Sequence, residues 1–169
     1  MEMISKPMAI IRAYQPQDSE QVRDCYIELQ EFERSIEPKR LPGQIAADAY
    51  IDYMFGKCSE YDGTLLVAEV EQRVVGFVCV WARVKPDEAE ALVNGPAESA
   101  VISDLVVLSA YRAKGLGRAL MDAAESFAIE KGASTLRIGV LAGNEAARRL
   151  YRSAGYDDYW IMLTKNLSN

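Results

Sequence analysis

The feature that most limits the fold of this chain is a pair of apolar, β-branched runs that lie close together. Residues 64–70 read TLLVAEV and residues 74–84 read VVGFVCVWARV, with three polar residues between them. Runs of this composition joined by a short polar connection are typical of a β-hairpin. A third run, AVISDLVVL at residues 100–108, carries a single charge, Asp104. A sheet built around the hairpin is therefore expected.

The rest of the chain adds helical patterns to these strands. Apolar residues recur at helical spacing in several stretches, and Gly132 and Gly155 stand where helices would end. The expected elements are, in chain order, a strand at 9–14, helices at 18–33 and 44–57, the hairpin, a strand at 100–108, a helix at 118–131, a strand at 135–141, a helix at 144–155 and a strand at 156–165. Strands that come first and then alternate with helices predict one α+β (mixed α/β) domain over residues 1–169.

The absence of histidine narrows the chemistry more than any other count. With none among 169 residues, a Ser-His-Asp triad, a Cys-His pair and a His-based zinc site are excluded. Proton transfer must then use carboxylates, tyrosine, lysine, cysteine, a chain terminus or water. The three cysteines are scattered and odd in number, so we expect a cytoplasmic protein with no disulfide framework and no metal site.

Charge and hydropathy argue against two classes of partner. The net charge of −6 disfavours nucleic acid and mildly favours a cationic partner. No apolar window is long enough to predict a membrane span. The N-terminal residues lack the basic and apolar segments of a signal peptide. We therefore expect no nucleic-acid partner and no membrane partner.

A glycine pair follows the third β-branched run. Residues 111–120 read YRAKGLGRAL, which places two glycines and three cations between a strand and a helix. Backbone N–H groups and the positive end of the helix dipole meet there, an arrangement that suits phosphate. A dinucleotide-binding loop would need glycine where Leu120 stands, and a P-loop would need Gly-Lys followed by Ser or Thr. The loop alone is equally compatible with a tight turn whose charges are solvated.

A second motif is the segment NEAARRLYRSAGY at residues 144–156. Asn144 is a suitable helix cap, and Tyr151 follows nearly two helical turns later, so the two lie along one face roughly 10 Å apart. By itself the same pattern is also typical of an ordinary core tyrosine.

Taken together, the two motifs resemble those of the GNAT superfamily of N-acetyltransferases. RAKGLG (residues 112–117) matches the family's acetyl-CoA pyrophosphate loop, and NEAARRLY (residues 144–151) matches its second conserved block. The clear resemblance covers residues 100–160. It implies a mostly antiparallel sheet of six to seven strands flanked by about four helices. It also implies a V-shaped splay between two parallel central strands, here residues 100–108 and 135–141.

The resemblance implies acetyl-CoA as co-substrate, bound in the V between the two strands. A strand backbone would pair with the pantetheine arm, loop amides would cradle the pyrophosphate, and the capping asparagine would bond the arm. The residues assigned to the coenzyme in this way are Leu105, Val106, Val107, Arg112, Ala113, Lys114, Gly115, Leu116, Gly117, Arg118, Asn144 and Tyr151.

Tyr151 is also the expected catalytic acid. In the reaction that the resemblance implies, an amine attacks the thioester directly and CoA thiolate leaves. An alkyl thiol has a pKa near about 8.5 and a phenol near about 10. A tyrosine can therefore hydrogen-bond or protonate the departing sulfur while staying neutral beforehand.

The general base is harder to assign. The two positions at which family members carry a glutamate fall on Val101 and Ser103. Asp104 is the remaining carboxylate of that strand, and strict alternation with Ser103 would place it on the opposite face, beneath the site. Glu33, at the end of the first helix, is the next candidate, either as a base acting through water or as an anchor for a cationic amine. A solvated helix-end carboxylate and a water relay without a dedicated base stay open beside these.

The implied function is an acetyl-CoA-dependent N-acetyltransferase that acts by direct attack of a primary amine. A small-molecule amine is slightly favoured over a protein lysine or N-terminus. The alternative is a non-catalytic acyl-CoA-binding or sensing module, which would not need Tyr151. Dimers are frequent in the family, so a homodimer is a further expectation.

Overall fold

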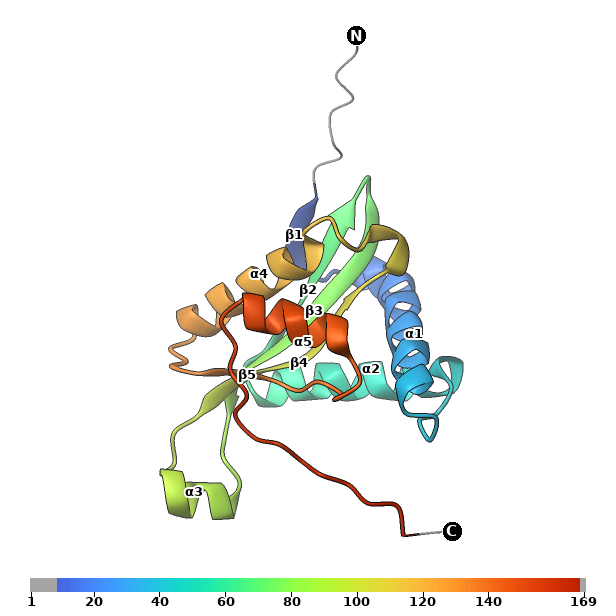
Figure 1. Cartoon of the computed structure of the whole chain (residues 1–169). Coiled ribbons are helices and arrows are strands. Elements are labelled where there is room, and N and C mark those ends of the chain that lie inside the picture. Colours follow the sequence, from blue (N-terminus) through green and yellow to red (C-terminus); the bar gives the residue numbers. More distant parts are fainter. Residues whose placement is uncertain (1–8, 168–169) are drawn as a thin grey trace.

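The computed structural model describes residues 9–167 and has one five-stranded sheet at its centre (Figure 1). Residues 1–8, part of the stretch considered for a signal peptide, lie outside the described residues. The sheet runs in chain order through β1 (Ile10–Ala13), β2 (Thr64–Val70), β3 (Arg73–Val84), β4 (Ser99–Val107) and β5 (Leu136–Ile138). Neighbouring strands are antiparallel except β4 and β5, which are parallel.

The predicted hairpin is confirmed as β2 and β3. Its turn is made by Glu71 and Gln72, whose φ angles are 50° and 65°. Two consecutive residues with positive φ give the tight turn whose twist matches that of paired strands. Further along β3, a Cβ atom on Gly76 would come within 2.5 Å of the Val106 carbonyl oxygen. Glycine at this position therefore permits the close approach of β3 and β4.

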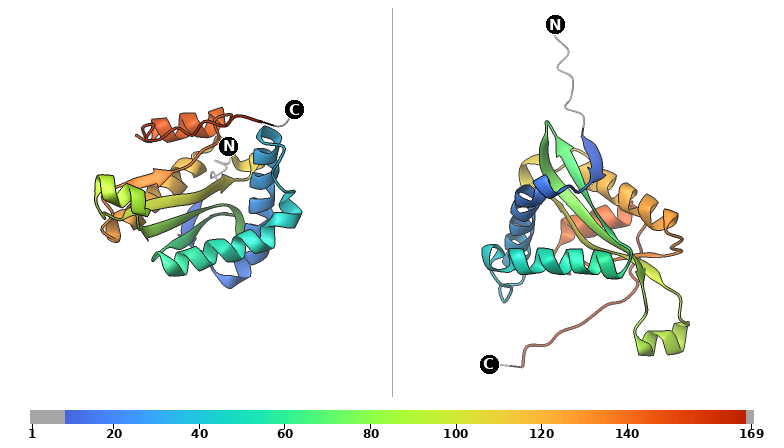
Figure 2. Two further views of the ribbon diagram at one scale, coloured as in Figure 1. Left: turned by 90° about the horizontal axis from the view of Figure 1, so that it is seen from below. Right: turned by 180° about the vertical axis from the view of Figure 1, so that it is seen from behind.

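Helices cover both faces of the sheet (Figures 1 and 2). They are α1 (Ser19–Ile36), α2 (Gly43–Glu60), α3 (Glu88–Asn94), α4 (Leu116–Glu130) and α5 (Glu145–Ser153), with short 3-10 turns at Pro16–Asp18 and Ser109–Tyr111. α1 and α2 lie on one face, while α4 and α5 lie on the other. α3 projects from the connection between β3 and β4. Within residues 9–167, none of the helices combines the length and the hydropathy that a membrane span requires.

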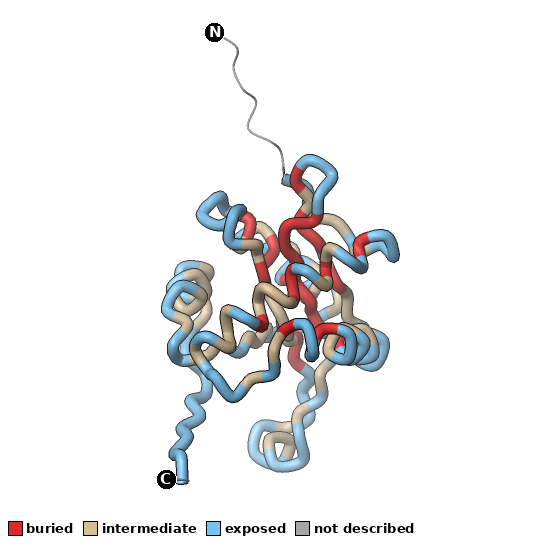
Figure 3. Tube along the Cα trace, turned by 90° about the vertical axis from the view of Figure 1, so that its right-hand side faces the viewer, coloured by how far each residue is buried: buried red, intermediate tan, exposed pale blue. Residues whose placement is uncertain are grey.

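Two apolar cores result, one on each face of the sheet. Phe77 of β3 packs with Met54 and Val22 on the α1–α2 side. Its neighbour Val78 packs with Leu120 on the α4 side. This alternation is the pattern expected of a strand buried on both faces. Figure 3 shows the buried residues concentrated along the central strands.

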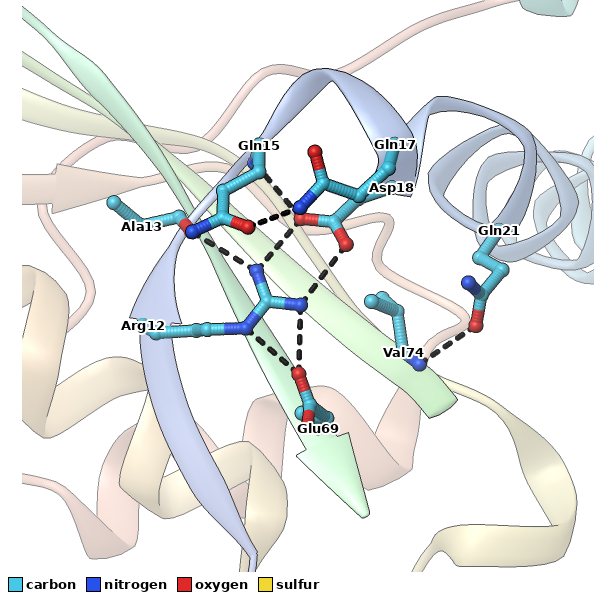
Figure 4. A network of polar contacts seen from close by, with 8 residues as sticks. All are labelled: Arg12, Ala13, Gln15, Gln17, Asp18, Gln21, Glu69 and Val74. Carbon is cyan, nitrogen blue, oxygen red and sulfur yellow. Dashed lines mark hydrogen bonds and ion pairs between the residues drawn. The ribbon is translucent and has the colours of Figure 1, made fainter. Parts of the chain in front are cut away.

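A polar network joins β1, the beginning of α1 and β2 (Figure 4). The Arg12 guanidinium donates to both carboxylate oxygens of Asp18, at 2.7 and 2.9 Å, and to Glu69 at 2.7 Å. The backbone N–H of Gln15 donates to Asp18 at 2.8 Å. Hydrogen bonds from Arg12 hold the pKa of the Asp18 carboxyl below its usual range.

Two predictions about the sheet are wrong. Among residues 9–167 the sheet has five strands rather than six to seven, whereas its five α-helices are consistent with the expectation of about four. The strand expected at 135–141 is reduced to β5. The strand expected at 156–165 is not formed, because this segment pairs with no strand of the sheet and is exposed from Asp157 onward. β-branched and aromatic residues favour a strand only where a neighbouring strand offers its backbone.

Candidate active site

The site begins where β4 and β5 separate. The two strands pair only over Ala100–Ile102 and Leu136–Ile138. β4 continues to Val107 with β3 on one side. Along residues 103–107, the backbone edge that faces away from β3 is therefore open to a strand-like ligand. The predicted pair of parallel strands that part from one another is confirmed.

Side chains on this part of β4 are used for packing. Val106 belongs to the core on the α1–α2 side, whereas Leu105 and Val107 pack against the core on the α4 side. Of the coenzyme contacts predicted for these three residues, only backbone contacts fit the structure.

The loop that follows β4 presents backbone amides. Ala113 and Gly115 have positive φ angles of 59° and 84°. The bond from Ala119 N–H to the Gly115 carbonyl opens α4 at 3.0 Å, so the amides of residues 116–118 have no acceptor within the helix. A Cβ atom on Gly115 would meet nothing within 4 Å, so the loop faces open space. These features suit an anion such as the pyrophosphate of acetyl-CoA.

The cations of the loop are less available than the sequence implied. Arg112 donates through Nε to the Val107 carbonyl at 2.8 Å. Arg118 donates to Asp122 of the same helix at 2.8 Å. The Lys114 Nζ lies over the ring of Tyr111, 5.3 Å from the ring centroid. Binding of an anion at this loop would rest mainly on the amides, with the cations adding long-range attraction.

α5 carries the second motif and contacts the first. The Asn144 Oδ1 accepts the backbone N–H of Ala147 at 3.1 Å, which confirms the predicted helix cap. A Cβ atom on Gly117 would lie 3.1 Å from Leu150 of α5, so glycine lets the two helices approach. Tyr151 is half-buried, unlike the fully buried core tyrosine that its pattern also allowed.

A β-bulge at Ser103 decides where Asp104 points. The pairing of β3 with β4 shifts by one residue there. Ile102 packs into the core on the α4 side and Val106 into the core on the α1–α2 side, although they are four residues apart. An extra residue in a strand breaks the alternation of faces in this way. The expectation that Ser103 and Asp104 lie on opposite faces is wrong, and Asp104 faces α2.

Asp104 accepts hydrogen bonds from Tyr50, a residue that no sequence motif predicts as part of the site. The Tyr50 hydroxyl of α2 lies 3.2 Å from both carboxylate oxygens. Burial raises the pKa of Asp104 to about 6, while the Ser103 hydroxyl and Tyr50 lower it and the charge of Glu33 raises it. Asp104 is thus a carboxylate that is ionised at neutral pH and more basic than usual. Tyr50 gives no sequence signal, because its role depends on the contact between α2 and β4.

Glu33 lies in the same region and is not a solvated helix-end group. It forms an ion pair with Arg40 at 3.0 Å, and its side chain is 24% exposed. Burial is the main cause of its raised pKa. Burial also raises the pKa of Tyr151, and the negative charges of Glu33 and Asp104 add to that shift. The three predicted catalytic side chains, from α1, β4 and α5, therefore act on one another electrostatically.

A cavity of about 550 Å³ lies beside Asp104, on the α2 side of the splay, and is lined in part by Tyr50 and Ser103. Its lining is mostly aromatic and apolar and comprises Tyr50, Tyr53, Trp81, Val101, Ile102, Ser103 and Gly139. The volume and the mixed lining are typical of a small-molecule site. Residues 9–167 contain no group of three His, Cys, Asp or Glu side chains placed to hold a metal ion.

Comparison with known proteins agrees with this geometry. The chain is 28% identical over 97 residues to the uncharacterized N-acetyltransferase YycN of Bacillus subtilis strain 168, which is 57% of this chain and 56% of that protein. The alignment thus spans little more than half of that relative's length.

Two solved structures share the fold. A transcriptional regulator from Bacillus halodurans C-125 superposes with a TM-score of 0.72 at 19% identity, over 95% of this chain and 100% of that one. The aminoglycoside N-acetyltransferase AAC(6')-Iy, in complex with CoA, gives 0.70 at 14% identity, over 99% and 100%. Residues 19–156 match the profile of the Acetyltransferase (GNAT) family. This match covers most of the chain, which therefore belongs to the GNAT acetyltransferase family.

Proposed function

We propose that this protein transfers an acetyl group from acetyl-CoA directly to a primary amine. The observation that carries the proposal is the meeting of two half-sites at the splay. One is the open backbone edge of β4 with the amide loop at residues 112–118. The other is the cavity beside Asp104. A donor and an acceptor bound on the two sides would meet between the strands.

The coenzyme half of the proposal uses residues 103–107, the amide loop and α5. The edge of β4 would hold the pantetheine arm, and the amides that open α4 would hold the pyrophosphate. A backbone N–H of Val106 or Val107 would polarise the thioester carbonyl. The Oδ1 of Asn144 caps α5, so its amide nitrogen is the group left to bond the arm. Acetyl-CoA, when bound, supplies the acetyl group as a thioester.

The acceptor half favours a small cationic amine. Asp104 lies beside the cavity, in contact with its lining residue Tyr50, and the charge of Glu33 acts on Asp104. The two carboxylates together attract an ammonium group. Aromatic walls add contacts to the substituent of the amine and to its positive charge. A cavity of about 550 Å³ holds a small molecule more readily than a folded protein surface. The three cysteines are free thiols, in keeping with the cytoplasmic setting that we propose.

Two side chains would move protons. An ammonium with a pKa near about 10.4 must lose a proton before it attacks. Asp104 takes that proton, directly or through water, and Tyr50 positions its carboxylate. Tyr151 stays neutral because its pKa is raised, so it can donate to the sulfur as CoA leaves. Glu33, fixed by Arg40, anchors the cationic substrate.

The test is thiol release from acetyl-CoA in the presence of a panel of diamines, amino acids, aminoglycosides and peptides. We expect release that depends on a small amine, together with an acetylated product of the matching mass. CoA binding measured by calorimetry without release on any amine would instead support the acyl-CoA-sensing module. Absence of both binding and release would contradict the proposed coenzyme site.

A further inference from the structure

Two cysteines that the proposed mechanism does not use lie in contact with one another. The Sγ atoms of Cys58 on α2 and Cys79 on β3 are 3.5 Å apart, although the two residues are 21 positions apart in the chain. Both are free thiols, and Cys79 is fully buried whereas Cys58 is half-buried. A disulfide joins its sulfur atoms at about 2.05 Å, so these two would need to approach by only about 1.5 Å.

The backbone around this pair keeps the end of α2 against β3. The Tyr61 carbonyl, just after α2, accepts the backbone N–H groups of Ala82 and Arg83 at 3.1 and 3.0 Å. A Cβ atom on Gly63 would lie 3.2 Å from the Cα atom of Cys58 and 2.5 Å from a carbonyl oxygen of β3. Glycine at this position therefore lets the helix and the strand approach closely, and the fold itself brings the two thiols together.

The two thiols of the pair differ in reactivity. The hydrogen bond with Cys79 is the main cause of the lowered pKa of Cys58, and Trp81 adds to that shift. The pKa of Cys79 is raised by the same hydrogen bond and by burial. Because the thiolate is the nucleophile of cysteine chemistry, Cys58 reacts first, and Cys79 lies within reach of the product. Cys25 on α1 has no such activation, since burial raises its pKa to about 12.

We propose that Cys58 and Cys79 form an oxidation site, at which a hydroperoxide converts the two thiols into a reversible disulfide between α2 and β3. The Cys58 sulfur attacks the terminal oxygen of the hydroperoxide and the O–O bond breaks. The departing alkoxide takes up the proton that Cys58 released and leaves as an alcohol. The Cys79 sulfur then attacks the Cys58 sulfenic acid, the S–O bond breaks, and water leaves with the Cys79 proton. The thiols lose two electrons, which the hydroperoxide gains, and other thiols reverse the step by exchange.

The disulfide would join two walls of the acceptor cavity. Tyr53 of α2 and Trp81 of β3 both line it, with ring centroids 6.1 Å apart. Cys79 lies opposite Asp104 in the pairing of β3 with β4, and α2 also carries Tyr50, which bonds Asp104. A cross-link that draws α2 toward β3 would move these groups, and a displacement of about 1 Å at a reacting group can cost about 100-fold in rate. Lower amine transfer on oxidation rests on the proposed function, whereas the cross-link itself does not.

The mass of the intact protein tests the cross-link. After treatment with a small molar excess of hydrogen peroxide, we expect the loss of two hydrogen atoms and a count of free thiols that falls from three to one. A tryptic peptide pair should be joined through Cys58 and Cys79, and dithiothreitol should restore all three thiols. Cys58→Ser should prevent the cross-link, while Cys25→Ala is the matched control and should keep it. Three remaining thiols, a sulfinic acid at Cys58 without a cross-link, or a disulfide through Cys25 would overturn the proposal.

Kinetics of the oxidised protein test the effect on the acceptor cavity. Oxidation should lower kcat/KM for the amine by about tenfold or more. The Kd for CoA should change by less than about twofold, because the proposed coenzyme contacts lie on β4, the following loop and α5 rather than on α2. Cys58→Ser should keep its activity in peroxide, and Cys25→Ala should lose activity as the wild type does.

Two outcomes separate this inference from the proposed function. Unchanged amine kinetics in protein whose mass shows complete cross-linking would refute the effect on the cavity. A reduced protein that acetylates no amine would contradict the proposed function alone, and the mass experiment would still decide whether Cys58 and Cys79 are an oxidation site.

Discussion

The part of the molecule up to and including Ala128 and the part after it are built differently. Both cores, the hairpin and the Arg12 network lie in the first part, which contains every fully buried residue of the described chain. From residue 129 to 167 no described residue is fully buried, although β5, α5 and the apolar segment at 157–167 are all there. The first part is stabilised by its own packing. By our proposed function, the second part is completed by the coenzyme.

The largest effect should come from removing a side chain of the first part. Phe77→Ala leaves a cavity in the core on the α1–α2 side and should lower the free energy of unfolding by about 3–5 kcal/mol. Leu141→Ala, a half-buried leucine of the second part, should cost only about 1 kcal/mol. Urea unfolding of both variants measures the difference. Equal losses would remove the contrast between the two parts.

A substitution of Asp104 tests the proposed general base, which belongs to the first part of the molecule. Asp104→Asn should lower kcat/KM by about 100-fold or more. In the wild type, activity should rise with pH as the carboxylate ionises, through its pKa of about 6, and this limb should be missing from the variant. An unchanged limb near pH 6 would point to another base.

The same group has a predictable effect on stability. The folded-state pKa of Asp104 is raised from 3.8 to about 6, so the folded protein binds its proton more tightly than the unfolded chain. Its contribution is fully present below about pH 4 and is lost as the pH rises through about 6. Asp104→Asn should flatten the unfolding free energy across this window. A variant that keeps the wild-type slope would show that other groups cause it.

Tyr151 tests the second part of the molecule. Tyr151→Phe removes only the hydroxyl and should lower kcat by about 10- to 100-fold, while the Kd for CoA changes by less than about twofold. Tyr156→Phe is the matched control, because its ring lies 6.2 Å from that of Tyr151, and it should keep near wild-type kcat. Equal losses of kcat and CoA affinity would argue against the role of the hydroxyl as acid.

A smaller effect is expected from the polar network of Figure 4. Arg12→Met leaves Asp18 with one of its hydrogen-bonding partners removed and should cost about 2 kcal/mol at neutral pH. The lowered pKa of Asp18 stabilises the fold above about pH 4, and this stabilisation is lost as the pH falls. The difference between wild type and variant should therefore shrink in acid. A constant difference down to pH 2 would contradict this account.

Local patterns in the sequence were enough to predict most elements of the molecule. The hairpin, the helices on both sides of the sheet and the caps at Asn144 and Gly155 follow from periodicity and turn chemistry, which are properties of neighbouring residues. The strand expected at 156–165 failed, because pairing depends on a partner that no local pattern contains.

The site was predictable to the same extent. The motifs predict the glycine loop and Tyr151 as parts of the candidate site. Tyr50 could not be predicted, since only the packing of α2 on β4 brings it to Asp104. The sequence also implied three cations free for phosphate, but Arg112 and Arg118 have acceptors within the protein.

The extra residue at the β-bulge of β4 affects how side chains of this strand are assigned to the two faces of the sheet. One inserted residue reverses the face of the sheet on which every later side chain of the strand lies. Strict alternation counted from Ala100 therefore assigns those later side chains to the wrong face. In this chain the change turns the Asp104 carboxylate toward Tyr50 of α2, whereas an unbroken strand would place it on the α4 face. A shift in strand phase can thus move an acidic side chain from one face of a sheet to the other, with no new acidic residue required.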